Sequence, residues 1–147
     1  MGFDGYFGNE RVVNLLRSVV AQRRLPQTLL LSGPSGVGKA TIARFLAAAA
    51  NCKEGVTENP CKVCTNCRRM LEADLSSGTI RALVTERIKM PAAKRQENPL
   101  VVSTHPDLLI FPPDGPLQLI TIEQARRLQE YARFGPSEGR WRFFIFH

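Results

Sequence analysis

The chain has 147 residues, of which 44% are hydrophobic and 22% charged, a composition that suits an ordinary globular domain with one core. No apolar run is long enough to cross a membrane, and the N-terminus lacks a basic and then apolar signal sequence, so we expect a cytoplasmic protein with no membrane partner. The formal net charge of +7 suits a polyanionic partner, although a charge of this size also serves general solubility.

The N-terminal residues predict a loop over 3–8 and then a helix. Asn9 is a good N-cap residue for a helix over 10–24, and Leu25-Pro26 ends it. One face of this helix is apolar and is expected to face the core. Its residues are Val12, Val13, Leu16, Val19 and Val20.

A glycine-rich stretch is the feature around which the chain is organised. It matches the phosphate-binding pattern G-x-x-x-x-G-K up to its lysine, follows a predicted buried strand at 28–32 and leads into a predicted helix over 41–50. In this context the backbone N–H groups of the loop point toward phosphate oxygens, and the lysine supplies a point charge. The alternative is a chance glycine-rich turn between a strand and a helix. The residues predicted to bind a nucleotide are Gly33, Pro34, Ser35, Gly36, Val37, Gly38, Lys39, Ala40 and Thr41.

The residue after the lysine departs from this pattern. The pattern has Ser or Thr there because the hydroxyl helps to hold Mg²⁺, whereas this chain has Ala40 and carries a hydroxyl only at Thr41. A helix turns about 100° per residue, so the Thr41 side chain should point elsewhere. We therefore expect ATP and Mg²⁺ as candidate ligands and no normal hydrolysis.

All the cysteines of the chain fall in one region with the spacing C-x8-C-x2-C-x2-C: Cys52, Cys61, Cys64 and Cys67. Thiolates at such intervals can converge on one tetrahedral Zn²⁺, and disulfides are the less favoured interpretation in a cytoplasmic protein. The alternatives are an iron–sulfur cluster or reduced thiols without a metal. Four thiolates leave no open coordination position, so the zinc is expected to be structural.

The pattern weakens between Ser76 and Thr104. Apolar residues at 80–88 fit one side of a helix, whereas 91–99 has no periodicity and predicts an exposed loop. The basic residues of this segment would suit contact with nucleic acid, although a solvated insertion is the favoured interpretation.

Clear patterns return toward the C-terminus. The apolar run 108–111 predicts a strand, and Thr121 with Gln124 predicts a capping box for a helix that stops at Gly135-Pro136. The run 143–146 predicts a parallel strand buried on both faces.

Strands that alternate with helices indicate an α/β domain with a mainly parallel sheet and a ligand site at the carboxyl ends of the strands. Nucleotide hydrolases of this kind have an Asp that holds Mg²⁺ at the end of an apolar strand, but the residue here is His147, which favours softer ions. Because the chain stops on a predicted core strand, we expect a fragment of a longer protein.

Together, these motifs resemble the N-terminal ATPase domain of bacterial DNA polymerase III clamp-loader subunits. The resemblance spans 3–146 except the insertion at 76–104, and it is specific because a zinc module directly after the phosphate-loop helix is rare outside that family. It is carried by the phosphate loop, Asn51-Cys52, the cysteine spacing, His105-Pro106-Asp107 and Ile120-Thr121-Ile122-Glu123-Gln124-Ala125-Arg126.

The resemblance implies an AAA+ P-loop domain over 1–147, truncated after its last strand, with flanking helices, a zinc-binding module at 52–74 and a basic insertion at 76–104. Such subunits form a hetero-pentameric ring within the DNA polymerase III holoenzyme, which uses ATP to open a sliding clamp and close it around primed DNA during replication. By this resemblance the loop holds the triphosphate, its lysine contacts the β- and γ-phosphates, Phe7-Gly8-Asn9 lies near the adenine, and the cysteines are the zinc ligands.

The family has two relevant branches. In gamma/tau the motor is complete, whereas delta-prime often carries a degraded nucleotide site and acts as the rigid member of the ring. Ala40 and His147 both remove contacts to Mg²⁺, on which phosphoryl transfer depends, so they favour delta-prime, with weak ATP binding or binding without turnover and no catalytic residue. The alternatives are an ATP-hydrolysing gamma/tau motor and, less favoured, a free-standing phosphoryl-transfer enzyme.

Overall fold

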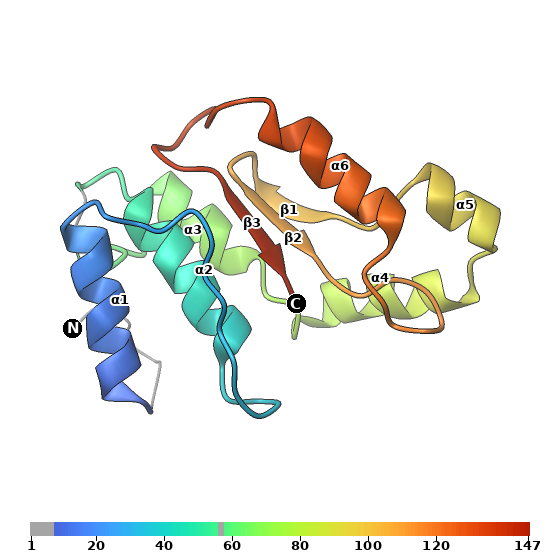
Figure 1. Ribbon diagram of the computed structural model, residues 1–147, viewed down its shortest axis with the longest axis horizontal. Coiled ribbons are helices and arrows are strands. Elements are labelled where there is room, and N and C mark those ends of the chain that lie inside the picture. Colours follow the sequence, from blue (N-terminus) through green and yellow to red (C-terminus); the bar gives the residue numbers. More distant parts are fainter. Residues whose placement is uncertain (1–7, 56–57) are drawn as a thin grey trace. The chain divides into compact units, whose positions relative to one another are not determined.

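The computed structural model describes residues 8–55 and 58–147, which form two compact units. The described part of Met1–Glu72 forms the first unit with Gly139–Trp141, and Ala73–Glu138 forms the second with Arg142–His147. No helix in these residues is long and apolar enough to cross a membrane. The elements labelled in Figure 1 are α1 (Glu10–Ala21), α2 (Lys39–Ala50), α3 (Thr65–Glu72), α4 (Gly78–Lys89), α5 (Ala92–Glu97), β1 (Val102–His105), β2 (Leu108–Phe111), α6 (Ile122–Ala132) and β3 (Phe143–Phe146).

The first unit is built around α2, which packs against both α1 and α3. Alanine is the strongest helix former, and the α2 alanines at 47–50 are buried, so α3 can approach this helix closely. The predicted apolar stripe of α1 is confirmed, because Leu16 and Val20 are buried while Leu15 is 61% exposed. Asn9 precedes α1 as expected, but its side chain makes no capping hydrogen bond.

The second unit contains a three-stranded sheet in the order β1-β2-β3. β2 pairs antiparallel with β1 and parallel with β3, and all four of its residues are buried. The ring of Phe111 stacks on Phe146 of β3 at a centroid distance of 5.1 Å. The predicted strands at 108–111 and 143–146 are thus confirmed.

Asp107 organises the connection between β1 and β2. Its buried carboxylate accepts hydrogen bonds from the backbone N–H groups of Ser137 and Glu138 at 2.6 and 2.8 Å. Its carbonyl accepts the N–H of Phe143 at 2.8 Å, next to the first parallel pair of β2 and β3. The Nδ1 atom of the buried His105 accepts the Asp107 N–H at 3.0 Å. The His-Pro-Asp motif therefore fixes the entry of β3 into the sheet.

The predicted capping box of α6 is confirmed. The Thr121 hydroxyl accepts the N–H of Gln124 at 3.3 Å, and the Gln124 side-chain oxygen accepts the N–H of Thr121 at 2.9 Å. The buried Gln124 amide also donates to the carbonyls of Leu100 and Pro112 at 2.8 and 2.7 Å. One residue therefore caps the helix and ties it to two loops.

A buried ion pair orders the segment that was expected to be a solvated insertion. Arg87 of α4 donates from Nε to Asp114 at 3.0 Å, and the two side chains are only 8% and 1% exposed. The same guanidinium donates to the carbonyl of Arg95 in α5 at 3.3 Å. The Arg87 charge, which was expected to belong to a solvated basic surface, is therefore buried and joins α4 to Asp114 and α5.

Four predictions of local structure were wrong. The segment 28–32 is not a strand: no strand pairs with it in the described residues, and Leu30 is 88% exposed. The sheet in the described part of the chain is mixed rather than mainly parallel. Residues 91–99 contain α5, whose Arg95 donates to the carbonyl of Met90 at 2.7 Å, so tertiary contacts override the weak pattern. β3 is not buried on both faces, because Phe146 is 50% exposed.

We expect Asp114→Asn to lower the free energy of unfolding by about 3–5 kcal/mol, because it leaves the buried Arg87 charge without its partner. The measurement is urea unfolding followed by circular dichroism. Glu86→Gln on the exposed side of α4 is the matched control and should change stability by less than about 0.5 kcal/mol. A paired Arg87→Met and Asp114→Leu variant should recover most of the loss. Equal effects of Asp114→Asn and the control would contradict this role of the ion pair.

Candidate functional site

The glycine loop adopts backbone angles that glycine favours. Gly36 and Gly38 have φ values of 80° and 89°, in the left-handed region that other residues avoid. Gly38 is the N-cap of α2, and the first hydrogen bond of the helix joins the N–H of Ile42 to the Gly38 carbonyl at 2.9 Å. The N–H groups of Lys39, Ala40 and Thr41 precede this bond and have no partner within the helix, so they can face an anion at its N-terminus.

Lys39 is the first residue of α2, and its side chain folds back over the loop. Its Nζ donates to the carbonyls of Gly33 and Pro34 at 2.9 and 2.7 Å. The ammonium group therefore lies against the loop, where an approaching phosphate could exchange with these carbonyls.

Ala40 and Thr41 complete the first turn of α2. Ala40 presents only a methyl group and offers no oxygen to a cation. The residues at the start of this helix therefore do not fit the usual Mg²⁺ site of a phosphate loop. Of the segment expected near the adenine, Phe7 lies outside the described residues. His147 directly follows β3 as predicted, and its backbone N–H donates to the Phe111 carbonyl at 3.3 Å.

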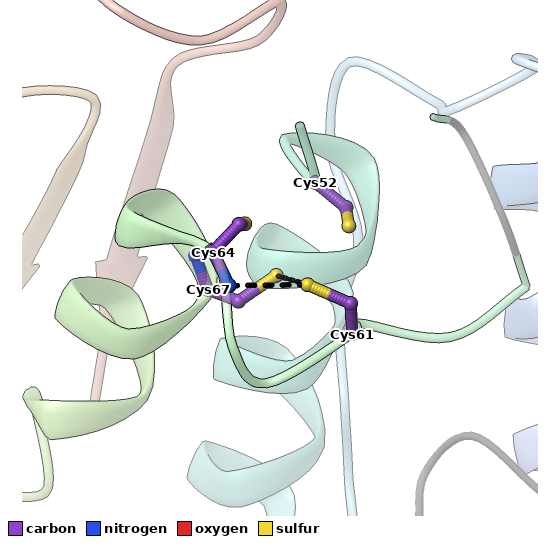
Figure 2. Close-up of side chains that lie close together, drawn as sticks. All are labelled: Cys52, Cys61, Cys64 and Cys67. Atoms are coloured by element: carbon purple, nitrogen blue, oxygen red, sulfur yellow. Dashed lines mark hydrogen bonds between the residues drawn. The ribbon is translucent and has the colours of Figure 1, made fainter. Parts of the chain in front are cut away.

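The four cysteines converge as their spacing predicts (Figure 2). Cys52 follows the end of α2, Cys61 and Cys64 lie in the loop before α3, and Cys67 lies within α3. Their Sγ atoms all lie within 4.8 Å of one another. Four thiolates around Zn²⁺ would stand about 3.8 Å apart, so a small inward shift completes a tetrahedron. This donor set fits one metal ion.

Backbone groups also support the cluster. The N–H of Cys64 donates to the sulfur of Cys61 at 3.2 Å, and the N–H of Cys67 donates to the sulfur of Cys64 at 3.4 Å. Lys62 takes a left-handed φ of 64°, which turns the chain between the first two ligands of the loop. Such N–H donors stabilise ionised sulfur and orient it toward a cation.

Burial and hydrogen bonds shift the pKa values of three thiols, those of Cys52, Cys64 and Cys67. Burial raises the pKa of Cys52, and it raises the pKa of Cys67 together with a hydrogen bond to Cys64. Burial acts in the same direction on Cys64, but hydrogen bonds from the backbone N–H groups of Lys53 and Cys67 and from neighbouring thiols outweigh it and lower the pKa to about 7. A cation at the centre would offset the cost of ionising the buried thiols.

Asn51 is a residue whose role the sequence did not reveal. Its side-chain oxygen accepts the backbone N–H groups of Arg140 and Trp141 at 2.7 and 2.9 Å, and its amide donates to the carbonyls of Trp141 and Ala47 at 3.0 and 3.2 Å. The side chain is thus fully hydrogen-bonded, and the residue is 2% exposed. A Cβ atom on Gly139 would lie only 2.3 Å from the Asn51 oxygen, so this approach requires glycine. In the sequence, the only sign of a role for Asn51 was its position between the predicted helix and Cys52.

Two further hydrogen bonds to backbone carbonyls hold the chain at Asn51 and Cys52, next to the cysteine cluster. Asn66 of α3 donates to the backbone carbonyl of Asn51 at 3.1 Å, and Arg140 donates to the carbonyl of Cys52 at 3.0 Å. The glycine loop and the cysteine cluster therefore lie at opposite ends of α2, and Asn51 fixes the cluster end to Gly139–Trp141.

We expect freshly purified, reduced full-length protein to contain about one Zn²⁺ per chain, and Cys67→Ser to lose most of it, because four thiolates form a complete tetrahedral site. Metal content by mass spectrometry is the measurement. Chelation should also speed amide hydrogen exchange in α3, which carries one ligand. Val63→Ala is the matched control, since Val63 is 76% exposed between two ligands, and it should keep the metal. Reduced protein without metal would overturn the zinc assignment.

We expect Asn51→Ala to lower the free energy of unfolding by about 2–4 kcal/mol, because it leaves several backbone groups without their partners. Asn14→Ala provides the same chemical change on the exposed face of α1 and should cost less than about 0.5 kcal/mol. Thermal and urea unfolding of both variants in the metal-loaded protein give the comparison. Similar losses in the two variants would show that the Asn51 hydrogen bonds contribute little.

Comparisons with known proteins agree with the resemblance found in the sequence. The family described as "DNA polymerase III, delta subunit" matches residues 8–147. The gamma/tau subunit of DNA polymerase III from Mycobacterium bovis is 43% identical over 138 residues, which cover 94% of this chain and 18% of that protein. The tau subunit from Escherichia coli is 39% identical over 85 residues, and the tau subunit from Bacillus subtilis is 30% identical over 74 residues.

These matches cover only part of the relatives. They include 52% of this chain and 13% of the E. coli protein, and 50% of this chain and 13% of the B. subtilis protein. The family match, in contrast, extends over nearly the whole sequence and includes the glycine loop, the cysteine cluster, Asn51 and the sheet. The chain therefore belongs to the DNA polymerase III delta-subunit family.

Proposed function

We propose that this chain is the N-terminal nucleotide-binding region of a bacterial clamp-loader subunit of the delta-prime type. In this proposal it binds ATP weakly or without turnover and carries a structural zinc module at 52–74. It assembles with the other subunits of a hetero-pentameric ring that loads the sliding clamp on primed DNA. Membership of the DNA polymerase III family supports the assignment to a clamp loader, and the glycine loop supports nucleotide binding.

The observation that carries the proposal lies at the start of α2. Gly36 and Gly38 have the left-handed angles of a phosphate loop, and Lys39 holds its ammonium group against the loop carbonyls. These features favour binding of a polyphosphate at the helix N-terminus. Ala40 lacks the hydroxyl through which such loops position Mg²⁺. Phosphoryl transfer depends on that cation to neutralise developing charge, so the arrangement supports binding more than hydrolysis.

The geometry of the four cysteines supports the zinc module in this proposal. Its four sulfurs lie within 4.8 Å of one another, and no coordination position is left open by four thiolates. Its structural role is to hold α3 against the end of α2, beside Asn51.

A gamma/tau motor of the same complex is the second candidate. It is favoured by the relatives, since proteins named gamma, tau or gamma/tau match this chain, and the match to the M. bovis protein covers 94% of this chain. In that case Thr41 or a residue outside this chain would have to replace the missing hydroxyl. The two candidates differ in whether this subunit turns over ATP.

The deciding experiment measures Mg²⁺-dependent ATP turnover by the full-length protein, alone and in the ring with its sister subunits, the clamp and primed DNA. Lys39→Ala removes the phosphate-binding charge, and Ala40→Thr restores the hydroxyl. We expect the protein alone to be inactive and Lys39→Ala to leave ring turnover within about twofold of the wild type, because the other subunits supply the motors.

The opposite pattern would support gamma/tau. If the wild-type protein hydrolyses ATP by itself and Lys39→Ala abolishes this turnover, the subunit is a motor and the delta-prime proposal is wrong. If the protein fails to join the ring at all, the clamp-loader assignment itself is wrong.

A further inference from the structure

We infer, on the basis of the nucleotide site proposed above, that this loop binds nucleoside triphosphates as the metal-free polyanion and does not require Mg²⁺. The inference goes beyond loss of turnover, because it specifies the ionic form of the ligand. It follows from the donors that the loop presents, from the position of Lys39 and from the missing hydroxyl at Ala40.

The loop presents only groups that attract negative charge. The N–H groups of Lys39, Ala40 and Thr41 have no partner within the helix and lie at its positive end. Lys39 adds a full charge at the same place, with its ammonium group 2.9 and 2.7 Å from the carbonyls of Gly33 and Pro34. These donors bind phosphate oxygens directly and need no cation between them.

The same stretch offers little to a metal ion. Mg²⁺ prefers carboxylate, hydroxyl and water oxygens, and Ala40 replaces the hydroxyl that a phosphate loop usually supplies. There is no Asp or Glu between Glu10 and Glu54, whereas this part of the sequence contains seven Lys and Arg residues, among them Arg23 and Arg24. Of these charges, Lys39 lies against the loop, where its Nζ contacts the carbonyls of Gly33 and Pro34.

The direction in which Mg²⁺ changes the affinity of the loop for ATP follows from these charges. When Mg²⁺ is bound to ATP, it cancels part of the phosphate charge and so weakens the attraction to Lys39 and the helix N-terminus. In an ordinary phosphate loop a contact between the metal and the hydroxyl compensates for this loss. Without that hydroxyl the compensation is missing, so removal of Mg²⁺ should leave binding unchanged or make it tighter.

The test is equilibrium binding of ATP to the full-length protein by titration calorimetry, in excess Mg²⁺ and in EDTA at equal ionic strength. We expect a wild-type dissociation constant in EDTA that is equal to, or up to about threefold lower than, the value in Mg²⁺. Ala40→Ser supplies the hydroxyl at a half-buried position with one added atom. It should tighten binding about tenfold in Mg²⁺ and leave binding in EDTA unchanged.

Lys39→Ala serves as the control for the site itself and should weaken binding at least about tenfold in both buffers. If the wild-type protein binds ATP in Mg²⁺ but not in EDTA, the inference is overturned while the nucleotide site stands. If folded wild-type protein binds ATP in neither buffer, the nucleotide site proposed above is wrong, and the inference falls with it.

Discussion

The hydrogen bonds of the Asn51 side chain are the interaction on which the first unit depends. The amide has two donors and two acceptor sites, and all four are used, by the carbonyl of Ala47 in α2 and by the backbone of residues 140 and 141. A buried amide that is fully satisfied in this way specifies one arrangement, because any displacement leaves polar groups unpaired in a place that water does not reach. Glycine at 139 is part of the same constraint, since no side chain fits there.

This constraint fixes the C-terminal end of α2, and the two ends of the helix differ in chemistry. Its N-terminus carries a glycine loop that favours anions, and its C-terminus leads into four thiols that favour a soft cation. The alanines at 47–50 provide no chemistry, yet their small size lets α3, with Cys67 and Asn66, approach the helix. The candidate phosphate site is thus built on an element whose far end is held by a buried amide and lies beside four clustered thiols, and rigid support of this kind favours a precise binding geometry.

Features that depend on local sequence could be predicted, and features that depend on distant contacts could not. The cysteine spacing, the capping box of Thr121 and Gln124, and the strands at 108–111 and 143–146 are local patterns, and the structure confirms them. The segment 28–32 is apolar enough for a strand, but a strand needs a neighbour, and none pairs with it in the part of the chain described. Arg87 looked like a solvated charge because its partner, Asp114, is 27 residues away. Asn51 was visible only as a residue beside Cys52, because its main partners are about 90 residues further along.

The contacts of the first unit join residues that are either close or far apart in the sequence, and this difference affects the order in which they can form. The four cysteines span only Cys52 to Cys67, so the loops closed by a metal are short and cost little entropy. The bonds from Asn51 to Trp141 close a loop of 90 residues and cannot form until residue 141 has left the ribosome. The cysteine cluster can therefore assemble on α2 and α3 during synthesis, before Gly139–Trp141 joins the first unit. A metal bound at that stage would stabilise the contact between α2 and α3 before the later contacts of Asn51 exist.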